Sequence, residues 1–260
     1  MTYAIKSVEA NQRLMQDLSA QVIRVWRDRV GPKLLPLLST VRLGGLVLAG
    51  LALWGFAEIA DEVLEKETQA FDTTILLSLR ELHNPLLDRL MIAITFLGEP
   101  TELTIMSLAL GAWLLWRGQR SEATTLAIAA AGAAGLNVLL KDVFARARPA
   151  LWARIVDVKY YSFPSGHAML SVVVYGLLGY LLATHFKRWR VGILISTAVL
   201  IAAIGFSRLY LGVHWPTDVL AGYAAGLVWL MTCILSIEIW RHRGTIRTQE
   251  AARPKSTSTK

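Results

Sequence analysis

One cysteine and few charges set the first limits on this chain. Cys233 is the only cysteine among 260 residues, so an internal disulfide and a zinc site built from thiolates are both excluded. Only 18% of the residues are charged, whereas 54% are hydrophobic and the mean hydropathy is +0.46. This composition excludes a disordered tail, a collagen-like repeat and most soluble enzymes. We therefore expect an all-α membrane protein.

The apolar residues gather in six runs that contain no Asp, Glu, Lys or Arg. A helix needs about 20 apolar residues to cross a bilayer, and roughly 17 suffice when flanking charges reach the interface. The first and second runs are short by this measure. The first spans if Arg42 and Glu58 reach the interface, and the second if its helix begins near Phe96. The sequence predicts six transmembrane helices around residues 43–57, 103–116, 123–140, 168–186, 191–207 and 219–237.

Lys and Arg are divided unequally between alternate connections. The termini and the loops on their side hold eighteen, and the opposite side holds nine. Basic residues favour the cytoplasmic side, so both termini are expected in the cytoplasm of a multi-pass protein of the bacterial inner or plasma membrane. The net charge of +8 and the pI near 9.8 then reflect topology, and a nucleic-acid partner is not expected.

The sequence divides into a basic cytoplasmic tail (1–40), a membrane domain (41–240) and a second basic tail (241–260). The first tail lacks the pattern of a cleaved signal peptide, and it fits an interfacial helix or a loosely structured segment equally well. Residues 71–90 predict short surface helices with a break at Asn84 and Pro85.

Four predicted helix ends at the extracytoplasmic face carry residues suited to binding an oxyanion. Lys141 and Arg148 are seven residues apart, which predicts two turns along one helical face. Arg208 closes the fifth span, and the fourth begins at Ser165 and Gly166. Cations near helix C-termini and free amides at a helix N-terminus together attract phosphate.

Two histidines and one aspartate complete this group. His167 and His214 lie on different helices, as a nucleophile and a general acid must, and Asp218 follows His214 by four residues. Taken singly, each residue has a structural reading: the cations as interfacial anchors, Asp218 as a partner of the helix dipole, residues 164–166 as a turn. Their common placement favours one catalytic site.

The spacing of these residues resembles the three-part signature of the type 2 phosphatidic acid phosphatase family, whose active site is shared with the vanadium haloperoxidases. The three parts are Lys141 with Arg148 and Pro149, then residues 164–167, then Ser207, Arg208, His214 and Asp218. The resemblance implies that His214 is the nucleophile, that Asp218 orients it, and that His167 protonates the leaving group. It further implies that phosphate is bound by Lys141, Arg148, Ser165, Gly166 and Arg208, without metal or cofactor.

The resemblance implies an enzyme that hydrolyses a lipid phosphate monoester or diphosphate, such as phosphatidic acid, through a phosphohistidine. An undecaprenyl-diphosphate phosphatase and a lipid phosphotransferase are alternatives with the same site. A vanadate-dependent haloperoxidase is disfavoured by six spans. A transporter or channel is disfavoured because its charges would lie near the midplane. A catalytically inactive lipid-binding relative is disfavoured by the two histidines and Asp218. Oligomeric state is left open.

Overall fold

The structure is a computed structural model that describes residues 40–152, 156 and 160–251, and side chains are described for 43–237 within these ranges. The interfacial helix considered for residues 1–40 lies outside the described residues. Residues 47–260 form one compact unit, and of the preceding unit the structure describes only the first turns of one helix. All regular structure in the described part of the chain is helical, as expected.

The helices follow the predicted apolar runs closely. The segment predicted to contain short surface helices forms two short helices, and the break between them falls at Asn84. The Asn84 side chain accepts hydrogen bonds from the Leu86 and Leu87 amides. A short 3-10 turn, η3 (Lys187–Trp189), lies directly before α9 (Arg190–Tyr210). The α-helices are α3 (Thr40–Glu65), α4 (Gln69–Arg80), α5 (Pro85–Phe96), α6 (Pro100–Trp116), α7 (Arg120–Phe144), α8 (Gly166–His185), α9 (Arg190–Tyr210) and α10 (Pro216–Ala251).

Five helical segments in the described residues are long and apolar enough to cross a bilayer: Leu43–Glu65, Arg120–Phe144, Gly166–His185, Lys187–Tyr210 and Pro216–Ile237. The protein is therefore a multi-pass integral membrane protein. The remaining expected span corresponds to α6, which has 17 residues. Its helix begins at Pro100 and not near Phe96, because α5 ends there and three residues separate the two helices. At about 1.5 Å per residue, α6 is somewhat shorter than a ~30 Å hydrocarbon core, so a sixth span is not confirmed.

Helix α8 is the centre of the bundle. It packs against α7, α9 and α10, and 67% of its membrane segment is buried, a larger share than in the other four. Two glycines of α10 permit the close approach to α8. A Cβ at Gly222 would lie 2.7 Å from the Ser165 carbonyl oxygen, and one at Gly226 would lie 2.7 Å from that of Met169. Small residues here allow the first turns of α8 and α10 to lie side by side.

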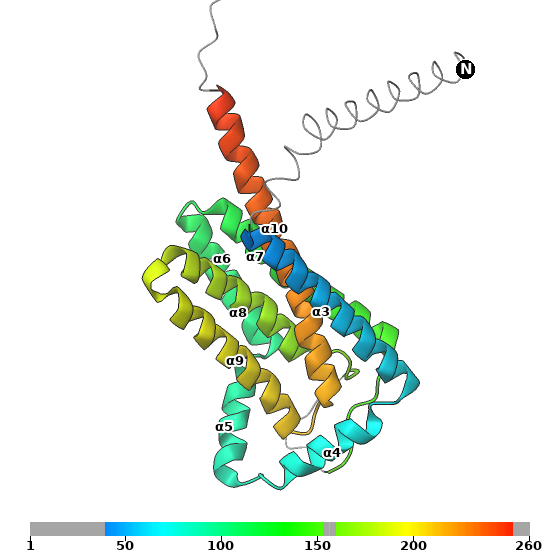
Figure 1. Cartoon of the computed structure of the whole chain (residues 1–260). Helices are drawn as coiled ribbons and strands as arrows, with labels where there is room; N and C mark the ends of the chain where they lie inside the picture. The colour runs from blue at the N-terminus through cyan, green and yellow to red at the C-terminus, as the bar shows by residue number, and fades with distance from the viewer. Residues whose placement is uncertain (1–39, 153–155, 157–159, 252–260) are drawn as a thin grey trace, which may run out of the picture. The chain divides into compact units, whose positions relative to one another are not determined.

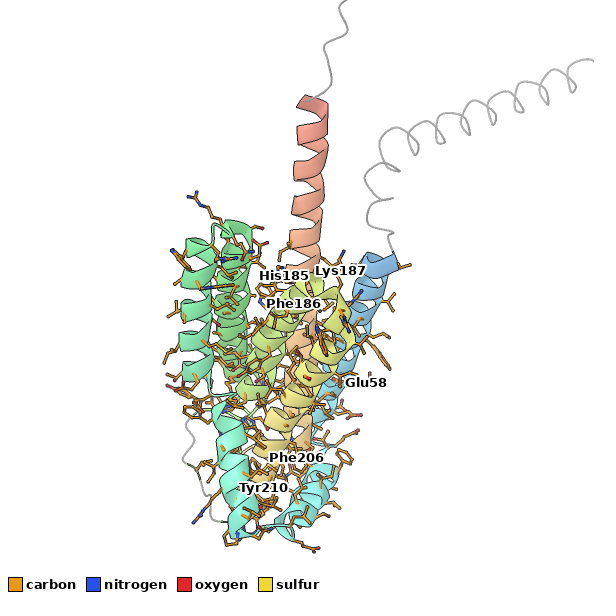
Figure 2. All side chains as sticks on the ribbon, turned by 90° about the vertical axis from the view of Figure 1, so that its left-hand side faces the viewer. Glu58, His185, Phe186, Lys187, Phe206 and Tyr210 are labelled. Atoms are coloured by element: carbon orange, nitrogen blue, oxygen red, sulfur yellow. The ribbon has the colours of Figure 1, made fainter. Side chains whose placement is uncertain are left out.

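Helices α4 and α5 lie at one end of the bundle, where α9 ends and α10 begins (Figure 1). Tyr210, the last residue of α9, is found at this end, whereas His185 and Lys187 lie at the opposite end (Figure 2). His83, in the α4–α5 connection, stacks on the Tyr210 ring and contacts the Tyr210 carbonyl oxygen at 2.7 Å. These contacts join α4 and α5 to the bundle, at the end where the predicted site residues are found.

Candidate active site

The four helix ends that the sequence predicts to carry the site residues meet at the α4–α5 end of the bundle. The Ser165 amide, immediately before α8, donates to the Asp218 carbonyl oxygen in the first turn of α10 at 2.9 Å. Arg148, which follows α7, donates to the Val213 carbonyl oxygen in the α9–α10 connection, also at 2.9 Å. Hydrogen bonds to backbone carbonyl oxygens thus bring all three parts of the motif together.

His214 lies between an arginine and a carboxylate. Arg148 Nη1 is 3.0 Å from His214 Nε2, and Asp218 Oδ2 is 3.3 Å from His214 Nδ1. Because a guanidinium can only donate, Nε2 must be the unprotonated nitrogen and Nδ1 must carry the proton that faces Asp218. The two neighbours therefore select the tautomer whose Nε2 lone pair points toward Arg148.

The His214 imidazole is buried, with 1% of the residue exposed. Burial lowers its pKa well below the usual 6.5, and the positive charges of Arg148, Arg208 and Lys141 lower the pKa further. The ring is consequently neutral at physiological pH. A neutral imidazole with an unprotonated Nε2 is the form that can attack phosphorus.

His167 lies in the first turn of α8 beside a carboxylate that the sequence analysis missed. Its Nε2 is 3.0 Å from Glu99 Oε2, and the Glu99 side chain is 47% exposed whereas that of His167 is 8% exposed. The contact with His167 lowers the pKa of Glu99 more than any other effect, burial opposes it, and Arg208 lowers it further. Glu99 is therefore ionised at neutral pH and can pair with a protonated His167.

We expect Glu99→Gln to reduce kcat on alkyl phosphates by roughly 10-fold, less than the 10²- to 10⁴-fold that a general acid contributes, because His167 remains but its imidazolium form loses its charged partner. The loss on an aryl phosphate should be smaller, since a phenolate leaves without much protonation. Steady-state kinetics on both substrates provide the measurement. Glu102→Gln, three residues away and also partly exposed, is the matched control. Equal losses on both substrates would contradict a link between Glu99 and proton donation.

The structure corrects the predicted placement of Arg148. Helix α7 ends at Phe144, and Ala145 follows in the left-handed region with φ of 42°, so Lys141 and Arg148 do not share one helical face. Pro149 explains the early end, because the ring of a proline in a continued helix would clash with the carbonyl four residues earlier. Arg148 reaches the site from a loop, and carbonyl oxygens hold its guanidinium: Nε donates to Tyr160 and Nη2 to Tyr161.

The other predicted phosphate ligands surround the same place. Lys141 Nζ donates to the Tyr161 carbonyl oxygen at 2.5 Å. Arg208 is 4% exposed and donates through Nη1 to Thr95 Oγ1 at 2.7 Å. Its Nε, together with Ser165 Oγ, is among the buried polar atoms of the described chain that have no hydrogen-bond partner. Such unpaired groups are costly unless a ligand satisfies them, and their donor character suits an anion.

Gly166 has a packing requirement as well as a free amide. A Cβ at this position would lie 2.9 Å from Asn137 Oδ1, on α7. Asn137 in turn donates to the Pro164 carbonyl oxygen at 3.3 Å, so the start of α8 is fixed against α7. The glycine therefore lets the N-terminus of α8 approach its neighbour while its amide remains at the helix end, where anions bind.

Sequence reasoning missed three charged residues of this site. Glu99 contacts His167, Arg146 contacts Asp218 through Nη1 at 2.7 Å, and Asp72 contacts Arg146 through Nη2 at 2.7 Å. Arg146 lies inside the first part of the motif, two residues before Arg148, and this proximity was an available signal. Asp72 and Glu99 belong to acidic connections in which nothing distinguishes them from their neighbours.

The described residues contain no group of three or more His, Cys, Asp or Glu side chains that could hold a metal ion. Apart from Asp218, the charged groups that act on His214 are the cations Arg148, Arg208 and Lys141, and cations recognise phosphate oxygens directly. Independence from metal stays a prediction that a chelator can test.

The similarity to known proteins covers the residues of the motif. The PAP2 superfamily model matches residues 122–241. Phosphatidylglycerophosphatase B of Bacillus subtilis is 30% identical over 176 residues, which cover 66% of this chain and 86% of that protein. Undecaprenyl-diphosphatase of Sulfolobus acidocaldarius is 35% identical over 133 residues, or 48% of this chain and 59% of that one. The crystal structure of the B. subtilis transmembrane PAP2 type phosphatidylglycerolphosphate phosphatase has a TM-score of 0.69 at 27% identity, covering 75% of this chain and 96% of that chain.

Proposed function

Because this chain belongs to the PAP2 superfamily, we propose that it is a phosphatase that removes a phosphate group from a membrane lipid through a phosphohistidine on His214. One observation carries the proposal: Asp218 at Nδ1 and Arg148 at Nε2 hold a neutral His214 with its Nε2 lone pair toward Arg148, within the field of Arg208 and Lys141. A nucleophile aimed into a cluster of phosphate-binding groups is the arrangement that covalent phosphoryl transfer requires.

In the first step, His214 Nε2 attacks phosphorus and the bond to the leaving oxygen breaks. His167, whose Nε2 lies 3.0 Å from Glu99 Oε2, donates a proton to the leaving oxygen. In the second step, His167 takes a proton from water, the hydroxide attacks the phosphohistidine, and phosphate leaves with His214 regenerated. Asp218 stabilises the positive charge that the His214 ring gains while it carries the phosphoryl group.

The cations bind the phosphoryl oxygens and stabilise the charge of the transition state. Arg148 and Arg208 provide planar donors, and Lys141 adds a third positive charge. All three act electrostatically on His214, where the phosphoryl group is attached. Ser165 Oγ, which is buried without a partner, and the Gly166 amide at the start of α8 provide neutral donors. Donors fixed by the fold before the substrate binds need little reorganisation during the reaction.

A lipid phosphate is the favoured substrate because the site lies at the end of helices that cross the membrane. The relatives are named for phosphatidylglycerophosphate, undecaprenyl diphosphate and lipid A phosphate. Phosphatidic acid or a related monoester is our first choice and undecaprenyl diphosphate the alternative. Transfer to a lipid acceptor instead of water would use the same groups. The excess of basic residues beside both termini supports cytoplasmic termini, six spans and an extracytoplasmic site.

The experiment is phosphate release by purified protein in detergent micelles that contain phosphatidic acid, phosphatidylglycerophosphate or undecaprenyl diphosphate. We expect turnover of at least one lipid to persist in excess chelator and to be inhibited by vanadate, which adopts the geometry of the phosphoryl transition state. Activity that is lost in chelator and restored by magnesium would contradict the mechanism. Phosphate release that requires a second lipid would indicate the phosphotransferase.

A further inference from the structure

Asp218 is held on both of its carboxylate oxygens. Oδ2 accepts from the Trp215 amide at 2.9 Å and faces His214 Nδ1, while Oδ1 accepts from Arg146 Nη1 at 2.7 Å. The Asp218 side chain is 0% exposed. Without Arg146, only the Trp215 amide would hold the carboxylate beside the imidazole, and a buried charge would lose its partner. The position of Arg146 therefore affects how Asp218 meets His214.

Arg146 is in turn held by α4. Its Nη2 donates to Asp72 Oδ2 at 2.7 Å and to Thr68 Oγ1 at 3.2 Å. Asp72 is 0% exposed, and the Arg146 side chain is 12% exposed. Because the guanidinium is a rigid planar fork, fixing Nη2 on Asp72 also fixes the direction of Nη1 toward Asp218.

Asp72 also holds the first turn of α10. The Thr217 amide donates to Asp72 Oδ1 at 3.1 Å, and the Thr217 hydroxyl lies 2.7 Å from Asp72 Oδ2 and 2.8 Å from Arg146 Nη1. Trp215, the residue before α10, has no side-chain oxygen to cap the helix. Asp72 supplies the missing acceptor from α4, while Asp218 accepts from the Trp215 amide, so the two carboxylates together cap the start of α10.

We propose that Asp72, which lies outside the three-part motif, is a positioning residue for phosphoryl transfer and acts through Arg146 and Thr217 to hold the Asp218 carboxylate against His214. This inference rests on the proposed function, because it takes Asp218 to support His214 as nucleophile. Asp72 touches neither His214 nor the phosphate-binding cations in any contact of the described structure. Its effect on the rate must therefore pass through Asp218.

The test is a double-mutant cycle of Asp72→Asn and Asp218→Asn, assayed with phosphatidic acid in detergent micelles and with an aryl phosphate. Asparagine keeps an oxygen for the Thr217 amide, so α10 keeps its cap, but it removes the charge that holds Arg146. We expect Asp72→Asn to lower kcat roughly 10- to 100-fold with little change in KM, the range seen when partners that orient a functional ligand are removed. In the Asp218→Asn background, the same change should cost no further activity.

Asp88→Asn is the matched control. Asp88 lies on α5 and accepts from the Tyr210 hydroxyl at 2.8 Å, so this variant removes a carboxylate contact at the same end of the bundle without touching Asp218. It should keep kcat near that of the unmodified protein, and a melting temperature for each variant shows how much folded protein was assayed. If Asp72→Asn does not fold, Arg146→Lys enters the same cycle, because one ammonium cannot span both carboxylates.

The outcomes separate this inference from the proposed function. A normal kcat for Asp72→Asn, or for Arg146→Lys where that variant replaces it, beside an impaired Asp218→Asn would overturn the positioning role alone. Equal losses from Asp72→Asn with and without Asp218 would also overturn it and assign Asp72 to stability. A normal kcat for Asp218→Asn would remove the orienting role that the proposed function gives to Asp218, and with it the positioning role of Asp72.

Discussion

Replacing His214 with alanine is expected to abolish phosphate release from lipid and aryl substrates alike, with a fall in kcat of roughly 10⁴-fold or more, as for other enzymes that lose a covalent nucleophile. The reason is that no other described imidazole has the same pair of neighbours, an arginine at one ring nitrogen and a carboxylate at the other. Substrate binding should change less, because Lys141, Arg148 and Arg208 remain.

Rapid acid-free quenching after mixing with radiolabelled substrate provides a second readout for His214. The unmodified protein should retain label on histidine, stable to alkali and labile to acid, and His214→Ala should retain none. His185→Ala is the matched control, since His185 lies at the opposite end of the bundle (Figure 2) and contacts Phe186. Label on a different residue, or substantial turnover by His214→Ala, would refute the assignment of the nucleophile.

His167→Ala should separate substrates by their leaving groups. An alkoxide leaves poorly unless protonated, so kcat on phosphatidic acid should fall about 10²- to 10⁴-fold, the usual contribution of a general acid. An aryl phosphate, whose phenolate needs little protonation, should retain most of the rate of the first step. The burial of His167 beside Glu99, with Nε2 3.0 Å from the Glu99 carboxylate, is the observation behind this expectation.

The two substrates serve as controls for each other in one preparation of His167→Ala. A general loss of folded protein or of phosphate binding would lower both rates by the same factor. The second step also uses His167, so the aryl phosphate should show a burst of phenolate followed by slow turnover. Equal losses without a burst would mean that His167 does not transfer the proton, and a structural role at the start of α8 would then explain its burial.

The sequence by itself determined the helices and the residues of the motif. Apolar runs of span length can satisfy their backbone groups in a bilayer only as helices, so five predicted spans coincide with long helices. The break at Asn84 was equally readable, because an asparagine before a proline caps a helix locally. The motif residues were found because their types and spacing are local properties of the chain.

Only the tertiary structure decided which of these residues touch, and through which atoms. Arg148 lies in a loop because Pro149 ends α7 early, which the seven-residue spacing alone did not reveal. The assignment of Nε2 as the free nitrogen of His214 depends on Arg148 and Asp218, 66 and 4 residues away in the chain. Spacing along one helix cannot predict such contacts, since they depend on how separate helices pack.

Asp72 and Glu99 show the same limit for residues outside the motif. Both belong to segments that contain other acidic residues, such as Glu67 and Glu81 near Asp72 and Glu102 near Glu99. Helix α4 brings Asp72 to Arg146, 74 residues later in the chain, and the α5–α6 connection brings Glu99 to His167. A carboxylate becomes part of a site when packing removes it from water beside a charge that needs it, and burial of this kind is a property of the assembled bundle.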